Sequence, residues 1–395
     1  MIFDALVIGG GPAGSTAAIL LAQAGWSVAI IEKARFPRRK VCGEFLSATN
    51  AGLLDELGIG EAYRSQAGPD IRRVGFFGYG STIIAPMPRI RGGAGWGRAL
   101  GRATLDSLLL QRASDAGATV FRPAAAVPLT SFAEGQTCEV TVEGGSMQLR
   151  ARVIIAAYGS WERGIREPDR LPRRASDLLA FKAHFVGGSL PPDLMPLIAF
   201  PGGYGGLAHS DGGQISFSLC IRRDMLEAAR HRFSGKPAAE AVFAHIAQSC
   251  RGVREALGGA ERDRAWLASG PIRPGVRKAY ADDVFAVGNL AGEAHPVIAE
   301  GISMAIQSSS LLAAELIGRR SELATEDGRA LAGVAYSTAW RRAFAGRIRA
   351  AALFAGLAMR PGASSLLPIV ERFPSILTLG ARLSGKTKLP PACAC

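Results

Sequence analysis

A glycine-rich turn after the first predicted strand constrains this chain more than any other feature. Residues 2–8 are almost all apolar and predict a short buried strand, while 13–24 predict a helix rich in alanine. Between them lie three glycines with the spacing G-x-G-x-x-G, namely Gly9, Gly11 and Gly14. Such a turn lets the backbone approach a pyrophosphate and lets the helix lie against the strand. The helix opens with Pro12 and Ala13, and the free backbone N–H groups of its first turn, which Pro12 lacks, would then face the anion together with the positive end of the helix dipole.

A second predicted strand ends on an acidic residue at the distance typical of dinucleotide-binding folds. Residues 26–31 (WSVAII) predict the strand, and Glu32 follows Gly14 by 18 positions. A carboxylate there can accept both hydroxyls of an adenosine ribose. The sequence therefore predicts a Rossmann-type site for an adenine dinucleotide. The basic loop 33–40, which begins with Lys33, either adds Coulombic support to the phosphates or is a solvent-exposed connection.

Composition narrows the class of protein. The 395 residues are 48% hydrophobic, which is enough for the cores of two domains or of one domain with a large insertion. There are 46 Lys and Arg residues against 33 Asp and Glu, a net charge of +13. The arginines occur in scattered pairs such as Arg38-Arg39 and Arg341-Arg342, so that we expect a solvated basic surface and no nucleic-acid partner.

The cysteines and the apolar runs of the sequence indicate in which cellular compartment we expect the protein. Six cysteines form neither a zinc-ligand pattern nor a C-x-x-C motif, so we expect free thiols, no metal site and a cytoplasmic protein. The chain runs directly into the glycine turn, which predicts no signal peptide. No apolar run is long enough to span a bilayer, and any membrane contact would be peripheral. A basic and apolar stretch near 341–359 either packs on the first domain or touches lipid.

The remaining pattern predicts an α/β fold in two domains with C-terminal helices. A β-meander at 137–157 rejoins the nucleotide-binding sheet, and alternating apolar and polar residues predict an inserted, mostly antiparallel substrate domain. A buried strand at 283–289 and a long helix at 296–317 complete the first domain. The predicted boundaries are 1–171 with 276–320 for the nucleotide domain, 172–275 for the substrate domain, and 321–395 for the helical region.

Several motifs in a fixed order carry a family resemblance. The glycine turn with Glu32 is followed by R-x-x-L-D at 102–106, A-A-Y-G-S at 156–160, G-N-L-A-G at 288–292 and E-G-I at 300–302. Over about residues 1–318 the chain resembles the superfamily of FAD-dependent aromatic hydroxylases, geranylgeranyl reductases and flavin halogenases. The resemblance implies that the bound dinucleotide is FAD.

The resemblance also implies roles for particular residues. Val127 falls where the family passes backbone beside the adenine, and Arg102 where a guanidinium supports the cofactor. Gly288 and Asn289 stand where the family has Gly-Asp, whose carboxylate holds a ribitol hydroxyl; the Asn amide can still make this hydrogen bond. Tyr158 departs from the usual Ala-Asp-Gly motif. The last helix opens where its N–H groups would face the N1 and O2 side of the flavin, at Glu300, Gly301 and Ile302.

The source of electrons stays open. The sequence shows one dinucleotide fingerprint, so that either NAD(P)H visits transiently or a separate reductase delivers electrons. By resemblance both occur in the superfamily. The oligomeric state is not predicted.

Three activities and one inactive alternative fit the motifs. The first is a monooxygenase that uses NAD(P)H and O2 to hydroxylate an aromatic or polyketide-like small molecule. The second is a reductase of isoprenoid double bonds, because C-G-E at 42–44 resembles a motif of geranylgeranyl reductases. A halogenase ranks third, since its W-x-W-x-I-P motif is missing after Trp96. A non-catalytic flavin-binding protein is the remaining alternative.

No catalytic residue is assigned from the sequence. Of five histidines, only His295 has a positional argument, because it precedes the segment expected to face the flavin. Cys42 is either a reactive thiol near the flavin or a small buried apolar residue.

Overall fold

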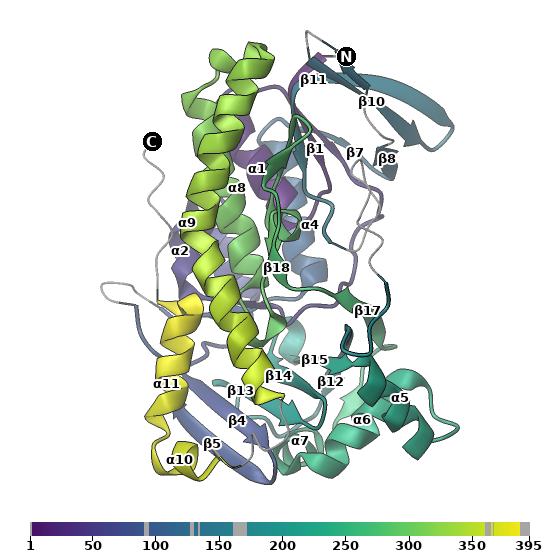
Figure 1. Ribbon diagram of the computed structural model, residues 1–395, viewed down its shortest axis with the longest axis vertical. Helices are drawn as coiled ribbons and strands as arrows, with labels where there is room; N and C mark the ends of the chain where they lie inside the picture. The colour runs from purple at the N-terminus through teal and green to yellow at the C-terminus, as the bar shows by residue number, and fades with distance from the viewer. Residues whose placement is uncertain are drawn as a thin grey trace.

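Two large sheets dominate the computed structural model, one in each half of an elongated molecule (Figure 1). The structure describes residues 2–90, 95–126, 130–132, 135–160, 172–359, 365 and 367–387. Within these residues the first sheet has nine strands and the second has eight. The predicted class, a Rossmann-type domain joined to a second sheet and C-terminal helices, is confirmed.

The first sheet is a mainly parallel sheet with the order β19-β20-β11-β1-β2-β7. Its strands are β1 (Ile2–Ile8), β2 (Val28–Ile31), β7 (Thr119–Phe121), β11 (Gly145–Ala156), β19 (Tyr280–Ala281) and β20 (Val284–Ala286). The meander strands are β8 (Ala124–Ala126), β9 (Thr130–Phe132) and β10 (Gly135–Val142). Strand β11 pairs antiparallel with β10 and parallel with β1, so that the predicted meander does rejoin the nucleotide-binding sheet.

Alternate residues of the first sheet face two different layers, as expected for strands buried on both sides. Ala5 and Val7 belong to a core cluster with the helices on one face, which are α1 (Pro12–Gln23), α4 (Arg102–Asp115) and α8 (Gly301–Gly318). Leu6 and Ile8 pack instead with Cys138 and other residues of the meander. The glycine turn between β1 and α1 therefore sits at a fully buried edge of the sheet.

The second sheet is antiparallel except where β13 runs parallel to β4. Its strands are β4 (Arg73–Gly78), β5 (Ser81–Pro86), β12 (Leu178–Val186), β13 (Leu194–Phe200), β14 (Gly203–His209), β15 (Ile215–Arg222), β16 (Glu261–Arg262) and β17 (Leu267–Ile272). One face packs on three helices, α5 (Arg223–Arg232), α6 (Ala238–Ser249) and α7 (Arg251–Leu257). The other face is turned toward the first domain, where Gly43 approaches Ser218 of β15.

Two sequence expectations need correction. Strands β4 and β5 lie within the range 1–171 assigned to the nucleotide domain, yet they extend the second sheet because β4 pairs with β13. The helix predicted from 296 begins only at Gly301: Ala299 adopts a left-handed φ of 51°, which interrupts the helix after a single 3₁₀ turn at Pro296–Ile298. The other domain boundaries stay predictions.

The remaining elements connect and cover the two sheets. They include β3 (Phe45–Leu46), α2 (Ala51–Glu56), α3 (Gly60–Gln66), β6 (Arg98–Ala99), β18 (Gly275–Val276), β21 (Gly292–Glu293), α9 (Glu326–Ala358), α10 (Leu367–Arg372) and α11 (Ser375–Ala381). Helix α9 runs along most of the molecule, and α10 and α11 lie beside β4 and β5 (Figure 1). None of the helices in the described ranges has both the length and the apolar character needed to cross a bilayer.

Candidate functional site

The glycine turn forms a buried cradle at the start of α1. Gly9 has a φ of 110°, and a Cβ atom there would lie 2.6 Å from the Ala157 carbonyl oxygen. A Cβ atom at Gly14 would collide with the carbonyl oxygen of Gly9. Helix α1 begins at Pro12 behind Gly11, which makes no side-chain capping hydrogen bond. Because these residues are buried, the first N–H groups of the helix need an acceptor, and a phosphate group fits that need.

Glu32 holds the cradle from the end of β2. Its side chain is 2% exposed, and its carboxylate accepts hydrogen bonds from the backbone N–H of Gly10 at 2.7 Å and of Ala34 at 2.7 Å. It also forms an ion pair with Arg38, with 2.9 Å between Oε1 and Nη1. The predicted ribose-binding carboxylate therefore also fixes the turn that would hold the phosphates.

Two arginines reach the same turn, although only one of them was expected by resemblance. A Cβ atom at Gly11 would lie 3.3 Å from Nη2 of Arg38 and 3.8 Å from Nη2 of Arg102. Both guanidinium groups bind the buried Asp106, with Nε to carboxylate distances of 3.4 Å for Arg38 and 2.6 Å for Arg102. The basic loop thus contributes Arg38 to the cradle, whereas Lys33 is exposed.

The segments predicted to hold the flavin end also meet this cradle. Gly288 has a φ of 60°, and a Cβ atom there would lie 3.1 Å from Cβ of Ala13, so two motifs far apart in the sequence are in contact. The Asn289 amide donates to Glu293 at 3.2 Å. Glu300 precedes α8, which begins with Gly301 and Ile302 and has no side-chain cap among the described residues. Val127 lies outside the residues that the structure describes.

These residues fit an FAD molecule. The buried N-terminus of α1, the N-terminus of α8 with its exposed Gly301, two arginines and one buried carboxylate lie between Glu32 and Glu300, and neither helix has a side-chain cap among the described residues. Such a set matches a ribose, two phosphates and a ring that carries negative charge when reduced. In the described part of the chain, no three His, Cys, Asp or Glu side chains gather where a metal could bind.

A buried ion pair joins the second sheet to the loop before β3. Lys182 of β12 lies with its Nζ atom 2.5 Å from Oε1 of Glu44, and His184 places Nε2 2.8 Å from Oε2. The backbone N–H of Arg102 also donates to Glu44 at 3.1 Å. Burial alone would raise the pKa of the Glu44 carboxyl, but Lys182 and His184 outweigh it and hold the pKa well below its usual range.

Cys42 lies beside this ion pair. Its carbonyl oxygen accepts a hydrogen bond from the Lys182 ammonium at 2.8 Å, and its thiol interacts with the Arg102 guanidinium. The sulfur is half-buried between two cations of the cradle and the second sheet. Sequence reasoning named Cys42 but missed Lys182, which an alternating strand pattern places among apolar neighbours with nothing to single it out.

A tyrosine and a histidine form a second polar contact on the same sheet face. The Tyr204 hydroxyl of β14 lies 2.8 Å from Nδ1 of His295, which precedes the turn before α8. Burial lowers the pKa of His295 to about 4 and raises the pKa of Tyr204 well above its usual value. Burial also raises the pKa of the neighbouring Cys220 thiol to about 12. At neutral pH this contact therefore consists of uncharged groups that can share and move a proton.

The neutral state of His295 predicts a pH dependence of stability. Its pKa is about 4 in the folded chain against 6.5 for an ordinary histidine, so between these values the unfolded chain binds more protons. The free energy of unfolding should therefore fall as the pH drops from 7 to 4, with a contribution from His295 of up to about 3 kcal/mol. Denaturant titrations of the wild type and His295→Gln at several pH values measure this contribution. In His295→Gln the free energy of unfolding should depend less on pH than in the wild type. Replacement of the exposed His231 by Gln, the control, should leave the pH dependence unchanged. The same pH dependence in all three proteins would contradict a neutral, buried His295.

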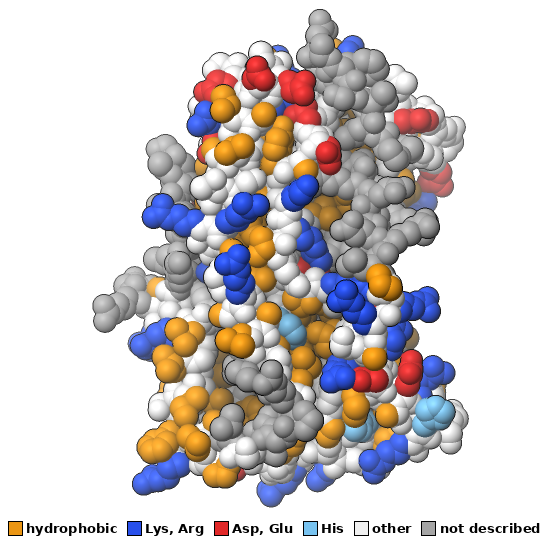
Figure 2. Space-filling model, viewed as in Figure 1, with side chains coloured by type: hydrophobic (Ala, Val, Ile, Leu, Met, Phe, Trp, Pro, Cys, Tyr) orange, Lys and Arg blue, Asp and Glu red, His pale blue; other side chains and the backbone are white. Residues whose placement is uncertain are grey.

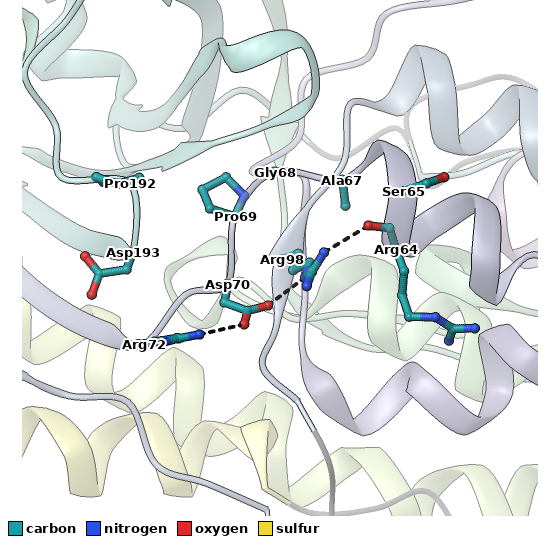
Figure 3. A pocket seen from close by; sticks show the side chains of 10 residues that line it. All are labelled: Arg64, Ser65, Ala67, Gly68, Pro69, Asp70, Arg72, Arg98, Pro192 and Asp193. Atoms are coloured by element: carbon teal, nitrogen blue, oxygen red, sulfur yellow. Dashed lines mark hydrogen bonds and ion pairs between the residues drawn. The ribbon is translucent and has the colours of Figure 1, made fainter.

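A hollow also lies elsewhere, between α3 and the start of β4 (Figure 3). Its volume is about 560 Å³, and its lining carries no residue of the glycine turn or of the start of α8. Arg98 and Arg72 both bind Asp70 there, with N–O distances of 2.7 and 3.3 Å. Each arginine in its wall, Arg64 included, already pairs with a carboxylate, so we assign no ligand to this hollow.

Comparison with known proteins agrees with this geometry. Residues 3–167 match the family model described as FAD binding domain. The chain is 29% identical over 336 residues to digeranylgeranylglycerophospholipid reductase 2 of Methanopyrus kandleri, which covers 83% of this chain and 78% of that protein. It is 32% identical over 157 residues to menaquinone reductase of Mycobacterium tuberculosis, covering 40% of this chain and 38% of that protein.

The fold also matches solved flavoenzyme structures. The myxobacterial chondrochloren halogenase CndH superposes with a TM-score of 0.78 at 24% identity, covering 97% of this chain and 90% of the halogenase. At this identity the likeness shows the fold alone. The superposition covers both sheets of this chain, so the halogenase has the same arrangement of a glycine-turn domain and a second sheet.

Proposed function

We propose that this chain, whose residues 3–167 match the FAD binding domain model and which resembles the superfamily of FAD-dependent aromatic hydroxylases, geranylgeranyl reductases and flavin halogenases, saturates a carbon–carbon double bond in a lipid with a prenyl tail. As an FAD-dependent oxidoreductase it needs a substrate that reaches the flavin-facing turn before α8. One relative, which matches 83% of the chain, is named digeranylgeranylglycerophospholipid reductase 2, and this name supports the substrate class.

The contact between Tyr204 and His295 carries the proposal. It lies in a cluster of otherwise apolar side chains from the second sheet, Leu178, Ala180, Cys220 and Ile272, with Val41 and Val297 from the segments next to the cradle. An apolar wall suits a hydrocarbon tail, because burial of each CH₂ group stabilises the complex by about 0.8 kcal/mol. One hydroxyl in such a wall is a suitable proton source for an alkene carbon.

The reaction needs one hydride and one proton. Bound FAD in its reduced form would supply the hydride to one carbon of the double bond. The Tyr204 hydroxyl would give its proton to the other carbon, while His295, with its hydrogen on Nδ1, would donate a hydrogen bond to the phenolate oxygen. Because burial raises the pKa of Tyr204, the phenolate would take up a proton again from water before the next turnover.

Hydroxylation of an aromatic or polyketide-like molecule is the competing proposal, and the motifs alone favour it. We rank double-bond reduction first because the observed wall offers an uncharged proton donor. The two activities differ in their need for O2, which makes them easy to separate.

The replacement Tyr204→Phe tests the proposal. We expect product formation to fall by about 10²-fold or more, because general acid catalysis contributes that much, while reduction of the flavin is unchanged. The assay uses dithionite as the electron source under anaerobic conditions, so that neither NAD(P)H nor a partner reductase is required, with a digeranylgeranyl phospholipid and a menaquinone as substrates. Mass spectrometry then measures the gain of two hydrogen atoms.

The control is Tyr63→Phe, which removes another buried hydroxyl that donates to the Arg98 carbonyl at 3.2 Å. It should retain full activity. Equal activity of Tyr204→Phe and wild type would contradict the role of Tyr204. Incorporation of oxygen into an aromatic substrate, with no saturation of any prenyl lipid, would support the monooxygenase instead.

A further inference from the structure

The segment from α10 through α11 to the turn Arg382–Lys386 exposes a row of large apolar side chains on its outer side. The exposed fractions are 53%, 56%, 40%, 52% and 72% for Ile369, Phe373, Ile376, Leu379 and Leu383. We call these five residues the apolar row. In Figure 2 hydrophobic side chains gather over the same region, at the lower left of the molecule, with Lys and Arg side chains near them. Contiguous exposed apolar surface of this kind marks an interaction site in soluble domains.

The row faces outward because the opposite side of the same segment is fixed to the second sheet. The Thr378 hydroxyl donates to the Pro86 carbonyl of β5 at 2.7 Å, and the Ser81 hydroxyl donates to the Glu371 carboxylate at 2.6 Å. Ala381 is buried in a cluster with Met87. The spacing of the row from 373 to 383 follows one helical face, so the segment is amphipathic. Polar groups on its other side, at Thr378 and Glu371, already make hydrogen bonds to the second sheet.

The charges around the row suit an anionic surface. Arg372 and Arg382 are exposed at its flank, and the described part of the segment from 367 to 387 has one carboxylate, Glu371, which is bound to Ser81. The whole chain carries a net charge of +13. A short amphipathic segment with cations beside its apolar face inserts about 5–10 Å into the headgroup region of a bilayer, and each basic residue near an anionic surface adds about 1 kcal/mol.

The segment also leads from this surface to the flavin-facing turn. Lys386, just after α11, donates from its buried ammonium to the Ile298 carbonyl at 2.6 Å and to the Glu300 carboxylate at 3.1 Å. Beneath α11 lies a cluster of Phe45, Ile71, Met87 and Ala381, with Ala299 packed against it. Apolar side chains thus continue from the exposed row to the residue that precedes Glu300.

We propose that the apolar row with Arg372 and Arg382 docks this protein on an anionic lipid bilayer, and that a prenyl tail passes from the bilayer along the cluster beneath α11 to the turn before α8. The docking surface does not depend on the proposed activity. The path of the tail rests on the proposed function, because it assumes that the substrate is a prenyl lipid. A bilayer suits the row better than a second protein chain, since five side chains on one short segment are fewer than the roughly 20–30 residues a side of a stable interface.

Vesicle flotation of the FAD-loaded protein tests the docking. Vesicles of phosphatidylcholine with phosphatidylglycerol should carry the wild type, and vesicles of phosphatidylcholine alone should carry about tenfold less. The double variant Phe373→Glu with Leu379→Glu should lose binding to both, and Arg372→Ala with Arg382→Ala should lose the preference for anionic vesicles. Retained flavin absorbance and an unchanged near-UV circular dichroism spectrum would show that each variant is folded.

The matched control places the same charges on another exposed apolar pair. Leu331 and Val334 of α9 are 60% and 66% exposed and follow the acidic Glu326 and Asp327. The variant Leu331→Glu with Val334→Glu should bind vesicles like the wild type. We call Phe373→Glu with Leu379→Glu the row variant. The proposal would be overturned if the row variant bound vesicles like the wild type, or if the control variant lost as much binding as the row variant. It would also be overturned if vesicles bound neither the wild type nor the row variant, and sedimentation showed a wild-type dimer that the row variant abolishes.

Turnover assays distinguish a failure of the proposed docking surface from a failure of the proposed activity. With dithionite as the reductant, the row variant should saturate a short water-soluble prenyl phosphate at the wild-type rate and should lose at least tenfold on a prenyl lipid embedded in vesicles. Equal rates on the embedded lipid would overturn the proposed path. If vesicles bind the wild type but no prenyl substrate is saturated, the proposed function fails while the docking surface stands.

Discussion

The variant Glu32→Ala is expected to purify with little or no FAD. The carboxylate is predicted to bind the adenosine ribose, and it also fixes the cradle through Gly10, Ala34 and Arg38. A hydrogen bond to a charged group contributes about 1.5–3 kcal/mol, so loss of two such bonds to the ribose should weaken binding by roughly 10²–10⁴-fold. Absorbance at the flavin bands after gel filtration, and titration of the apoprotein with FAD by calorimetry, measure the loss.

Two further variants show which property of Glu32 matters. Glu32→Gln keeps one acceptor for the backbone N–H groups but removes the charge that pairs with Arg38, and it should lie between wild type and Glu32→Ala. Arg35→Ala breaks an exposed ion pair with Glu143 in the same loop and should bind FAD normally. Full flavin occupancy in Glu32→Ala would refute the ribose assignment and, with it, the orientation of the cofactor along the path to Glu300.

The cradle could be predicted from the sequence because its parts are local. Strand, glycine turn, helix and acidic residue follow each other within 32 residues, and each has its own steric reason. The resemblance assigned Gly288 to the cofactor site, but its contact with Ala13 could not be predicted, because a contact between residues so far apart follows from sheet order. The predicted strand, glycine turn and helix are present in the structure, and the family model covers them, whereas the cofactor contacts of Glu32, Gly288 and Asn289 stay predictions.

The polar contacts of the second sheet could not be predicted because they depend on register. Tyr204 and Lys182 reach their partners only because β14, β15 and β12 are aligned so that these residues share the face turned to the first domain. A shift by one residue would turn both side chains to the opposite face. The same limit explains why β4 and β5 were assigned to the first domain: local alternation predicts a strand but not its neighbour.

The variant Lys182→Met is expected to destabilise the protein by about 3–5 kcal/mol, because it leaves the Glu44 carboxylate buried without its ammonium partner. Both side chains are nearly inaccessible, with exposed fractions of 0% for Lys182 and 2% for Glu44. Glu44 also has a positive φ of 64°, so the loop must hold a backbone conformation that is rare for this residue type. Denaturant unfolding at pH 7, followed by circular dichroism, measures the change in the free energy of unfolding.

The pH dependence of this loss distinguishes an unpaired carboxylate from a simple packing defect. In the wild type the pKa of Glu44 is held below its usual value of 4.5, so its contribution to stability is present above pH 4.5 and is lost only as the pH falls below it. Without Lys182, burial would raise the pKa of Glu44 above that of the unfolded chain, and stability would then be lost as the pH rises. The difference between wild type and Lys182→Met should therefore shrink as the pH is lowered from 7 to 5.

The double variant Lys182→Met with Glu44→Gln completes the cycle. Replacing both partners removes the buried ion pair, so we expect it to recover most of the stability lost in Lys182→Met, although His184 then faces an amide in place of the Glu44 carboxylate. A double variant as unstable as the single one would show that the side chain of Lys182 stabilises the domain junction by packing alone. A Lys182→Met protein as stable as the wild type at pH 7 would mean that Glu44 is protonated or reaches water, and that the two sheets are not joined through this ion pair.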